Sequence, residues 1–265
     1  MTMKVSRYGW QPDLPDHRDL LYAAPPSLVK KLPKKIDLSG KCPPVYDQGE
    51  LGSCTANAIG AAFEFELMKQ SSNLNFMPSR LFIYYNERAM EHTVGSDSGA
   101  QIRDGIKSVN KLGVCPEAIW QYDIPKFTDK PPENCFTDAL THQVLSYHRV
   151  PRSLSQLKGC LAQGYPFVFG FTVYSAFESE AVAKTGKLEM PKKNEQVEGG
   201  HAVLAVGYND TGKRFLVRNS WGELWGMKGY FTMPYDYLLE PNLSDDMWTI
   251  RLVELNPAAR RAKTK

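Results

Sequence analysis

The chain has 265 residues, of which 42% are hydrophobic and 23% charged, and its formal net charge is +3. This composition predicts a globular protein that buries a core in one large domain or two compact lobes. The small net charge argues against a protein built around nucleic-acid phosphates, and no apolar run approaches the roughly 20 residues of a membrane-spanning helix. We therefore expect no nucleic acid and no membrane as partner, and we expect a monomer.

Residues 1–31 predict an extended N-terminal arm, which is a candidate short pro-segment. The stretch WQPDLPDHRDLLYAAPPS holds four prolines, and these prevent a continuous helix. The first residues, MTMKVSRYGWQPDLPD, lack the apolar segment of a standard secretory signal. We therefore expect the protein to be cytoplasmic, or exported without a standard signal peptide.

Residues 32–145 predict a helical lobe. Ile102, Ile106, Val109 and Leu112 recur at intervals of four and three, which is the spacing of one face of a helix. Residues 81–90 form another apolar helix candidate. Helices should therefore dominate this half of the chain.

Residues 146–258 predict a lobe made mostly of antiparallel strands. Ser153 and Gln156 resemble a capping box that opens a short helix ending before Gly164. Short runs rich in β-branched and aromatic residues follow, namely PFVFGFTV, HAVLAVGY, RFLVRNSW and GYFTMPY. The turn sequence at 209–212 predicts a hairpin between the second and third runs. A basic tail, residues 259–265, ends the chain.

The cysteines give no sign of a metal site. There are five of them, separated by long, irregular gaps without a Cys-x-x-Cys pair: Cys42, Cys54, Cys115, Cys135 and Cys160. This pattern differs from a zinc ribbon and from a dense disulfide framework. We expect no metal ion and no cofactor, and at least one thiol must remain unpaired.

Cys54 stands where a glycine-containing loop turns into an alanine-rich helix, in the segment YDQGELGSCTANAIGAAF. A thiol is a strong nucleophile only as the thiolate, and the first turn of a helix stabilises that charge through its free N–H groups and dipole. Gly49 and Gly52 would let the loop fold tightly enough to expose the sulfur. Position alone leaves a catalytic and a structural role equally open.

His201 is the histidine best placed to act as a base. It follows two glycines and opens the strand candidate AVLAVGY, so a rigid element would hold its imidazole at a strand edge. Asn219 follows in the segment NSWGELWGMKGY, between strand residues and two tryptophans. A buried asparagine needs hydrogen-bond partners, and an imidazole N–H is a suitable one.

Three segments together resemble the signature blocks of the papain family of cysteine peptidases. They are QGELGSC around Cys54, GGHAVLAVGY around His201 and RNSWGELWGMKGYF around Asn219. They occur in the family's order within roughly residues 32–250, and the separation of Cys54 from His201 lies in the range of about 130–150 residues expected of such enzymes. The short arm makes the chain similar to bacterial members of the family such as xylellain.

The resemblance implies a role for each residue of the site. Cys54 would be the nucleophile, His201 the general base and acid, and Asn219 the residue that orients the histidine, with the first two forming a thiolate and imidazolium pair. Gln48 would stabilise the oxyanion together with the Cys54 backbone N–H. Trp221 would shield the contact between histidine and asparagine.

The resemblance also implies the fold and the substrate contacts. The fold would be α+β, with a helical left lobe, an antiparallel β-barrel-like right lobe and the active site in the cleft between them. Ser98 and Gly99 occupy the place where the family binds the substrate backbone with a Gly-Gly pair. Gly170 and Gly200 would border a roomy, mostly apolar pocket for the side chain two residues before the cut.

The chain departs from the family's pattern at three places, and two of them concern disulfides. Leu51 replaces a cysteine three residues before the nucleophile, and Thr55 replaces an aromatic residue just after it. A further cysteine, before the Gly-Gly pair, is also absent. We therefore expect none of the family's usual disulfides, which fits a reducing compartment or a disulfide-free branch of the family.

The expected function is that of a cysteine endopeptidase that hydrolyses peptides or proteins through a thioester acyl-enzyme. An acyl transferase or amidase would use the same triad, and a non-catalytic binding module would keep only the fold. We further expect the arm to lie in the cleft as an intramolecular inhibitor; a brace on the back of the lobes or a disordered tail are the alternatives. Six apolar side chains could fill the pockets of the cleft: Tyr8, Trp10, Leu14, Leu20, Leu21 and Tyr22.

Overall fold

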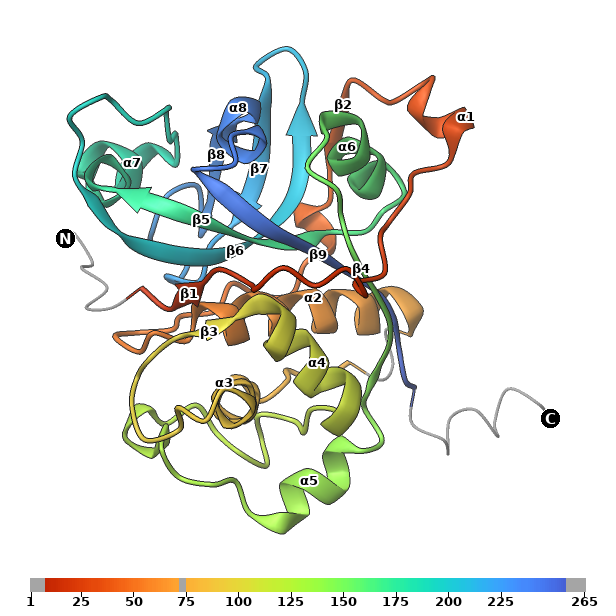
Figure 1. Ribbon diagram of the computed structural model, residues 1–265, viewed down its shortest axis with the longest axis vertical. Helices are drawn as coiled ribbons and strands as arrows, with labels where there is room; N and C mark the ends of the chain where they lie inside the picture. Colours follow the sequence, from red (N-terminus) through yellow and green to blue (C-terminus); the bar gives the residue numbers. More distant parts are fainter. Residues whose placement is uncertain (1–7, 72–74, 256–265) are drawn as a thin grey trace.

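Two lobes meet along one central helix in the computed structural model, which describes residues 8–71 and 75–255 (Figure 1). The sheet-rich lobe occupies the upper half of the view and the helical lobe the lower half. The predicted basic tail at residues 259–265 lies outside the described residues. Within them, no helix has the length and apolar character needed to cross a membrane.

The central helix α2 (Cys54–Gln70) is buried on all sides along most of its length. Every residue from Cys54 to Leu67 is buried, and the helix packs against strands β6 and β9 of one lobe and helices α3 and α4 of the other. Small residues in its first turns allow both lobes to approach closely. A helix in this position fixes its first residue, Cys54, at the junction of the lobes.

The helical lobe contains the two helices predicted from the apolar spacing, α3 (Arg80–Met90) and α4 (Ile102–Leu112). Helix α5 (Glu133–Ala139) and the short 3-10 helix η3 (Ile124–Lys126) complete it. Gly113 follows the last residue of helix α4, and two features of this glycine exclude a side chain. Its φ is +76°, and a Cβ would lie 1.7 Å from the carbonyl oxygen of Ala139.

The sheet-rich lobe is built on strands in the order β4-β9-β5-β6-β7-β8, all pairing antiparallel. The four predicted strands correspond to β5 (Phe167–Tyr174), β6 (Val197–Asn209), β7 (Arg214–Arg218) and β8 (Tyr230–Pro234). Strands β4 (Val144–Arg149) and β9 (Ser244–Val253) complete the order. The hairpin expected at 209–212 joins β6 to β7.

Short helices cover the sheet-rich lobe. They are α6 (Leu154–Ala162), the 3-10 helix η4 (Ser175–Glu178), α7 (Glu180–Thr185) and α8 (Tyr235–Leu239). The helix predicted after residue 153 is therefore present, but its capping box is not. Ser153 makes no side-chain cap, because its hydroxyl pairs with the hydroxyl of Ser155.

The division of the chain into lobes is less simple than the sequence suggested. Strand β2 (Lys35–Asp37) falls in the segment assigned to the helical lobe, yet it pairs with β6 in the sheet. The 3-10 helix η1 (Ser39–Lys41) follows it and leads the chain towards α2. The helical segment is thus tied to the other lobe at its start.

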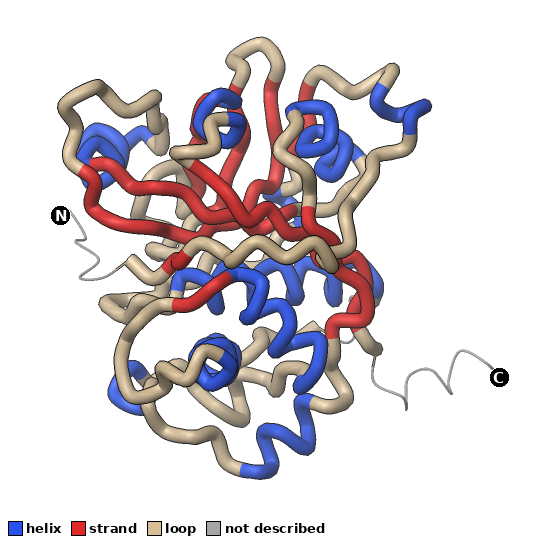
Figure 2. The backbone as a smooth tube through the Cα atoms, viewed as in Figure 1, coloured by secondary structure: helices blue, strands red, loops and turns tan. Residues whose placement is uncertain are grey.

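The arm crosses the junction of the two lobes. In Figure 2 it runs as a tan tube between the red strands and the blue helices. Its strand β1 (Trp10–Gln11) pairs in parallel with β3 (Ala100–Gln101) of the helical lobe. Farther along, the Tyr22 N–H donates to the Arg149 carbonyl at 2.8 Å, and a one-turn helix α1 (Pro26–Val29) follows.

Two of the six apolar arm residues expected to fill pockets of the cleft do so, namely Tyr8 and Trp10, which are half-buried beside the site. Tyr22 is also buried, but it packs in the core of the sheet-rich lobe and not in the cleft. Leu14, Leu20 and Leu21 instead point to solvent, with 64% to 70% of their surfaces exposed. The expectation for these three leucines was wrong, because the backbone and polar side chains hold that part of the arm.

Candidate active site

The structure places Cys54 at the first position of α2, preceded by the loop that carries Gln48. The Cys54 side chain is fully buried, and its sulfur accepts a hydrogen bond from the backbone N–H of Ala202, the neighbour of His201. The N–H groups at the start of α2 add a positive end of the helix dipole. Nucleophile and base therefore lie side by side, although 147 positions separate them in sequence numbering.

His201 is oriented by Asn219. The imidazole Nε2–H donates to the Asn219 Oδ1 at 2.8 Å, and that oxygen also accepts from the Ser220 backbone N–H at 2.9 Å. This leaves the lone pair of Nδ1, which has no hydrogen-bond partner among the described residues, free to receive a proton. Trp221 covers the pair, with its ring 5.2 Å from the imidazole and 1% of its surface exposed.

Two hydrogen bonds fix the side chain of Gln48, in the loop that leads to Cys54. Its Oε1 accepts from the Ser220 hydroxyl at 2.7 Å, and its Nε2 donates to the Leu51 carbonyl at 2.9 Å. One amide hydrogen remains for a further acceptor. Ser220, which the sequence did not single out, therefore links the asparagine loop to the glutamine that would stabilise an oxyanion.

Burial shifts the pKa values of the candidate catalytic pair, Cys54 and His201. It raises the pKa of the Cys54 thiol to about 11, although N–H groups of Ala202 and Gly9 oppose the shift. Burial also lowers the pKa of His201 to about 4, opposed by the hydrogen bond to Asn219. Both shifts favour a neutral thiol and a neutral imidazole, in contrast to the thiolate and imidazolium pair that the family resemblance implies. The physical cause is burial, because both side chains are fully inaccessible to solvent between the lobes and the arm.

Comparison with known proteins decides the family. The family model described as papain family cysteine protease matches residues 32–244. The chain belongs to the papain family of cysteine proteases. It is a hydrolase with the two-lobe papain-like fold, and its catalytic cysteine is expected at Cys54.

Two relatives match this papain-family peptidase over nearly its whole length. A peptidase C1-like protein of Acanthamoeba polyphaga mimivirus is 44% identical, covering 95% of this chain and 89% of its own. The crystal structure of xylellain, a cysteine protease from Xylella fastidiosa, is 46% identical with a TM-score of 0.88, covering 94% and 97% of the two chains. Digestive procathepsin L 3 of Tenebrio molitor has a TM-score of 0.72 at 19% identity, covering 95% and 78%, and shows the fold alone.

The arm of this papain-family chain passes directly over Cys54. The Gly9 N–H donates to the Cys54 sulfur, and the Gly9 carbonyl accepts from the Ala100 N–H at 2.8 Å. Gly9 fits between two other glycines. A Cβ on Gly9 would lie 1.6 Å from the Gly52 carbonyl oxygen, and a Cβ on Gly99 would lie 2.1 Å from the Gly9 carbonyl oxygen.

The five substrate-binding candidates from the sequence all lie beside the arm: Ser98, Gly99, Gly170, Gly200 and Trp221, whose ring is 6.3 Å from that of Tyr8. The Gln11 side chain donates to the Ser98 carbonyl at 2.6 Å, next to Gly99. The indole of Trp10 fills the space over Gly170 and Gly200, where a Cβ would lie 1.9 Å and 2.8 Å from ring atoms. The pocket expected to be mostly apolar also contains a carboxylate, because the Trp10 Nε1–H donates to an Asp246 oxygen at 3.1 Å.

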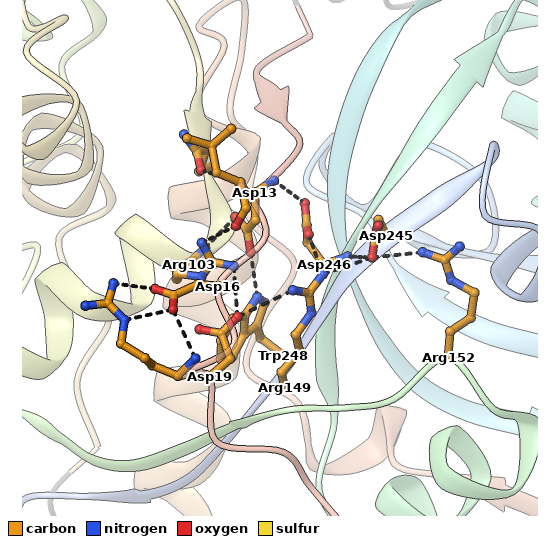
Figure 3. Close-up of polar contacts among 12 residues, drawn as sticks. Asp13, Asp16, Asp19, Arg103, Arg149, Arg152, Asp245, Asp246 and Trp248 are labelled. Carbon is orange, nitrogen blue, oxygen red and sulfur yellow. Dashed lines mark hydrogen bonds and ion pairs between the residues drawn. The ribbon is translucent and has the colours of Figure 1, made fainter.

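Beyond Trp10, buried polar contacts anchor the arm to both lobes (Figure 3). Asp13 accepts from the Arg103 backbone N–H at 3.0 Å in the helical lobe and from the Trp248 Nε1–H at 2.8 Å in the sheet. The Asp13 N–H donates to Asp246 at 2.8 Å. The sequence gave no sign of these anchors, since the partners lie 90 or more positions from Asp13.

A network of ion pairs extends the anchor. Asp19 of the arm pairs with Arg103 at 2.8 Å and with Arg149 at 3.4 Å. Arg149 also pairs with Asp245 and Asp246 at 3.2 Å each. Arg103 therefore links the arm to helix α4, and Arg149 links it to strands β4 and β9 (Figure 3). Because Asp19, Arg103 and Asp246 are nearly inaccessible to solvent, breaking one partner would leave a buried charge uncompensated.

Proposed function

We propose that this papain-family chain is a cysteine endopeptidase that cleaves extended polypeptides through a thioester acyl-enzyme. The observation that carries the proposal is that the site already holds a polypeptide. The arm runs through it on both sides of Cys54, with Tyr8 beside His201 and Trp10 over Gly170. A site that accommodates continuous chain on both sides of its nucleophile suits an endopeptidase.

The chemistry follows from the contacts of the triad. His201 takes the proton of Cys54 at Nδ1, and the sulfur attacks the substrate carbonyl. The Cys54 backbone N–H and the free amide hydrogen of Gln48 face the oxygen that gains charge. His201 then gives its proton to the leaving amine, and a thioester to Cys54 remains. Water, activated by the same imidazole, hydrolyses that thioester and restores the thiol.

The arm acts as an intramolecular inhibitor in this proposal. It excludes substrate from Cys54 and adds to the burial of the site, and burial favours the neutral forms of Cys54 and His201. Displacement of the arm returns water to the site and removes much of the desolvation that opposes the charged pair. The nucleophile is then both uncovered and activated.

The direction of the arm supports inhibition without self-cleavage. In a substrate, the leaving amine lies on the C-terminal side of the cut, next to His201. In the arm, the residue next to His201 is Tyr8, and the later residue Trp10 lies on the acyl side, over Gly170. The arm therefore runs opposite to a substrate, and its peptide bonds present their amines away from the proton donor.

Only part of the arm serves this purpose. Residues 8–13 cover the site, whereas Tyr22 and Ala24 belong to the core. Ala24 packs so closely on Gly159 that a Cβ there would lie 2.5 Å from the Ala24 Cβ. The second half of the arm thus fits the alternative interpretation, in which the arm is a brace packed on the lobes. Removal of all of residues 1–31 would disturb the fold, so point substitutions near Gly9 are the better test.

An experiment separates the endopeptidase from the other uses of the triad. Purified protein is incubated with a peptide library under reducing conditions, and mass spectrometry identifies the cuts, with Cys54→Ala as the control. Internal cuts by the wild-type protein and none by the variant are expected. Products formed only when a competing amine is added would identify an acyl transferase and contradict the proposal, as would the absence of any reaction.

A further inference from the structure

Tyr8 shows what the site beside His201 can hold. Its ring lies 5.8 Å from the imidazole and 6.3 Å from the Trp221 ring, between ring centroids. It packs on Gly199, where a Cβ would lie 2.8 Å from the Tyr8 Cβ. At the far end, the phenol O–H donates to the Glu178 Oε1 at 2.5 Å. The space thus has aromatic and glycine walls and a carboxylate at its end.

Glu178 is fixed in place relative to the catalytic histidine. It ends the 3-10 helix η4, whose Phe177 is fully buried and packs against Trp221 at 5.1 Å and His201 at 6.2 Å. The same helix is tied to the following loop, because the Ala176 N–H donates to Glu195 at 2.7 Å. The 3-10 helix that carries Glu178 is therefore fixed relative to His201.

This space must receive part of a substrate once the arm leaves. His201 gives its proton to the leaving amine, so that amine lies beside the imidazole. The side chain of the residue that carries the amine then enters the space now filled by Tyr8. Glu178 would be the polar group that it meets at the end of the space.

We propose that Glu178 is a specificity-determining residue, which favours a long side chain with a hydrogen-bond donor at its tip immediately after the scissile bond. Tyrosine, arginine and lysine fit this description. The inference rests on the proposed endopeptidase function. A hydrogen bond to a carboxylate is stronger than one between neutral groups, and a substrate without a donor leaves the Glu178 oxygen without that partner.

Charge near the space favours basic side chains as well. The carboxylates of Glu178 and Glu198 both raise the pKa of Tyr8, after the larger effect of burial. A guanidinium or ammonium group would interact favourably with the same two charges. Glu198 is exposed, so its contribution is screened by salt, whereas the direct contact with Glu178 persists.

The test compares peptides that differ only at the residue after the cut, cleaved by the full-length protein. Tyrosine and phenylalanine differ by one hydroxyl, and we expect kcat/KM to be about tenfold higher for tyrosine. Arginine should exceed leucine by a similar factor. The arm competes equally with every peptide, so its occupancy cancels from these ratios.

Variants assign the preference to the carboxylate. Glu178→Ala should reduce both ratios to about one, while Glu178→Gln should keep much of the tyrosine preference and lose that for arginine. Glu180→Ala is the matched control, because Glu180 is an exposed glutamate two positions away that pairs with Lys184, and it should leave both ratios unchanged.

Equal kcat/KM for tyrosine and phenylalanine, or ratios that survive in Glu178→Ala, would overturn the inference. In that case cleavage itself would still stand as support for the endopeptidase. If no peptide of the series is cleaved at all, the proposed function fails, and the inference fails with it.

Discussion

Gly9→Ala should convert the covered protein into an active one. Gly9 lies against the Gly52 carbonyl on one side and Gly99 on the other, and the new methyl group would lie 1.6 Å from the Gly52 oxygen. An ordinary van der Waals contact to a Cβ begins at 3.4 Å. The position of the new Cβ is fixed by the backbone of residue 9, and the Gly52 carbonyl is itself backbone, so no side-chain rotation relieves the overlap. The arm has to lift from Cys54.

The size of the effect follows from the overlap. An extra methyl group in a tightly packed site costs about 1–3 kcal/mol. This corresponds to a shift of about fivefold to 150-fold in the equilibrium between covered and open forms. Initial kcat/KM on a short peptide should rise by the same factor, up to the limit at which the open form predominates.

The assay measures initial rates of full-length, uncleaved protein, with intact mass checked at the end. Gly40→Ala is the matched control, since Gly40 is exposed and a Cβ there meets nothing within 4 Å. A second measurement follows tryptophan fluorescence in the Cys54→Ala background. Release of Trp10 from its half-buried position should shift the emission to longer wavelength in Gly9→Ala but not in Gly40→Ala.

Unchanged kinetics would refute the reasoning. If Gly9→Ala and wild-type proteins have the same initial kcat/KM while the fluorescence shows that the arm has moved, the arm does not restrain the enzyme. If neither quantity changes, the packing of Gly9 against Gly52 is not as tight as the structure describes.

Three further outcomes are expected. Cys54→Ala and His201→Ala should each remove nearly all hydrolysis, and Asn219→Ala should reduce kcat less, because Asn219 orients the imidazole but transfers no proton; an equal loss for all three variants would contradict that role. Alkylation of the unfolded protein without reduction should label five cysteines by intact mass, since all five are free thiols in the structure and four of them are buried in the folded chain; two fewer labels would reveal a disulfide. Burial and the neighbouring Asp246 raise the pKa of Asp13 to about 7 while the arm is docked, whereas the pKa of a free aspartate is about 3.9. The protonated Asp13 carboxyl group therefore stabilises the docked arm fully below about pH 4, and this stabilisation is lost as pH rises through about 7. The rate of wild-type protein relative to an arm-released variant should therefore rise with pH, and Asp13→Asn should flatten the rise; a ratio that falls with pH would contradict the sign.

The candidate catalytic residues could be predicted from the sequence because the motifs around them are local and resemble those of the papain family. Cys54 stands where a glycine-containing loop becomes a helix, and His201 follows two glycines and precedes a strand. The structure brings both together with Asn219 and Gln48. Ser220 carries no such signal, because a serine next to an asparagine predicts nothing until its hydroxyl is seen to hold the Gln48 amide.

Long-range pairings explain most of what the sequence could not predict. Strand β9 begins with Ser244, Asp245 and Asp246, which disfavour a strand, and it forms because β4 and β5 flank it. The arm is similar, since its anchor joins Asp13 to residues in both lobes. Charge spacing along the chain contains no information about such contacts. The raised pKa of Cys54 likewise depends on burial that arises only in the folded chain.

Acylation of Cys54 is the most direct test of the central claim. Full-length Gly9→Ala is mixed with an activated peptide ester, quenched in acid during the initial burst, and digested for mass spectrometry. We expect the acyl mass on Cys54 alone, and no adduct in His201→Ala over the same time. An acyl group on another residue, or ester turnover that persists in Cys54→Ala, would contradict the assignment of Cys54 as the nucleophile of this peptidase.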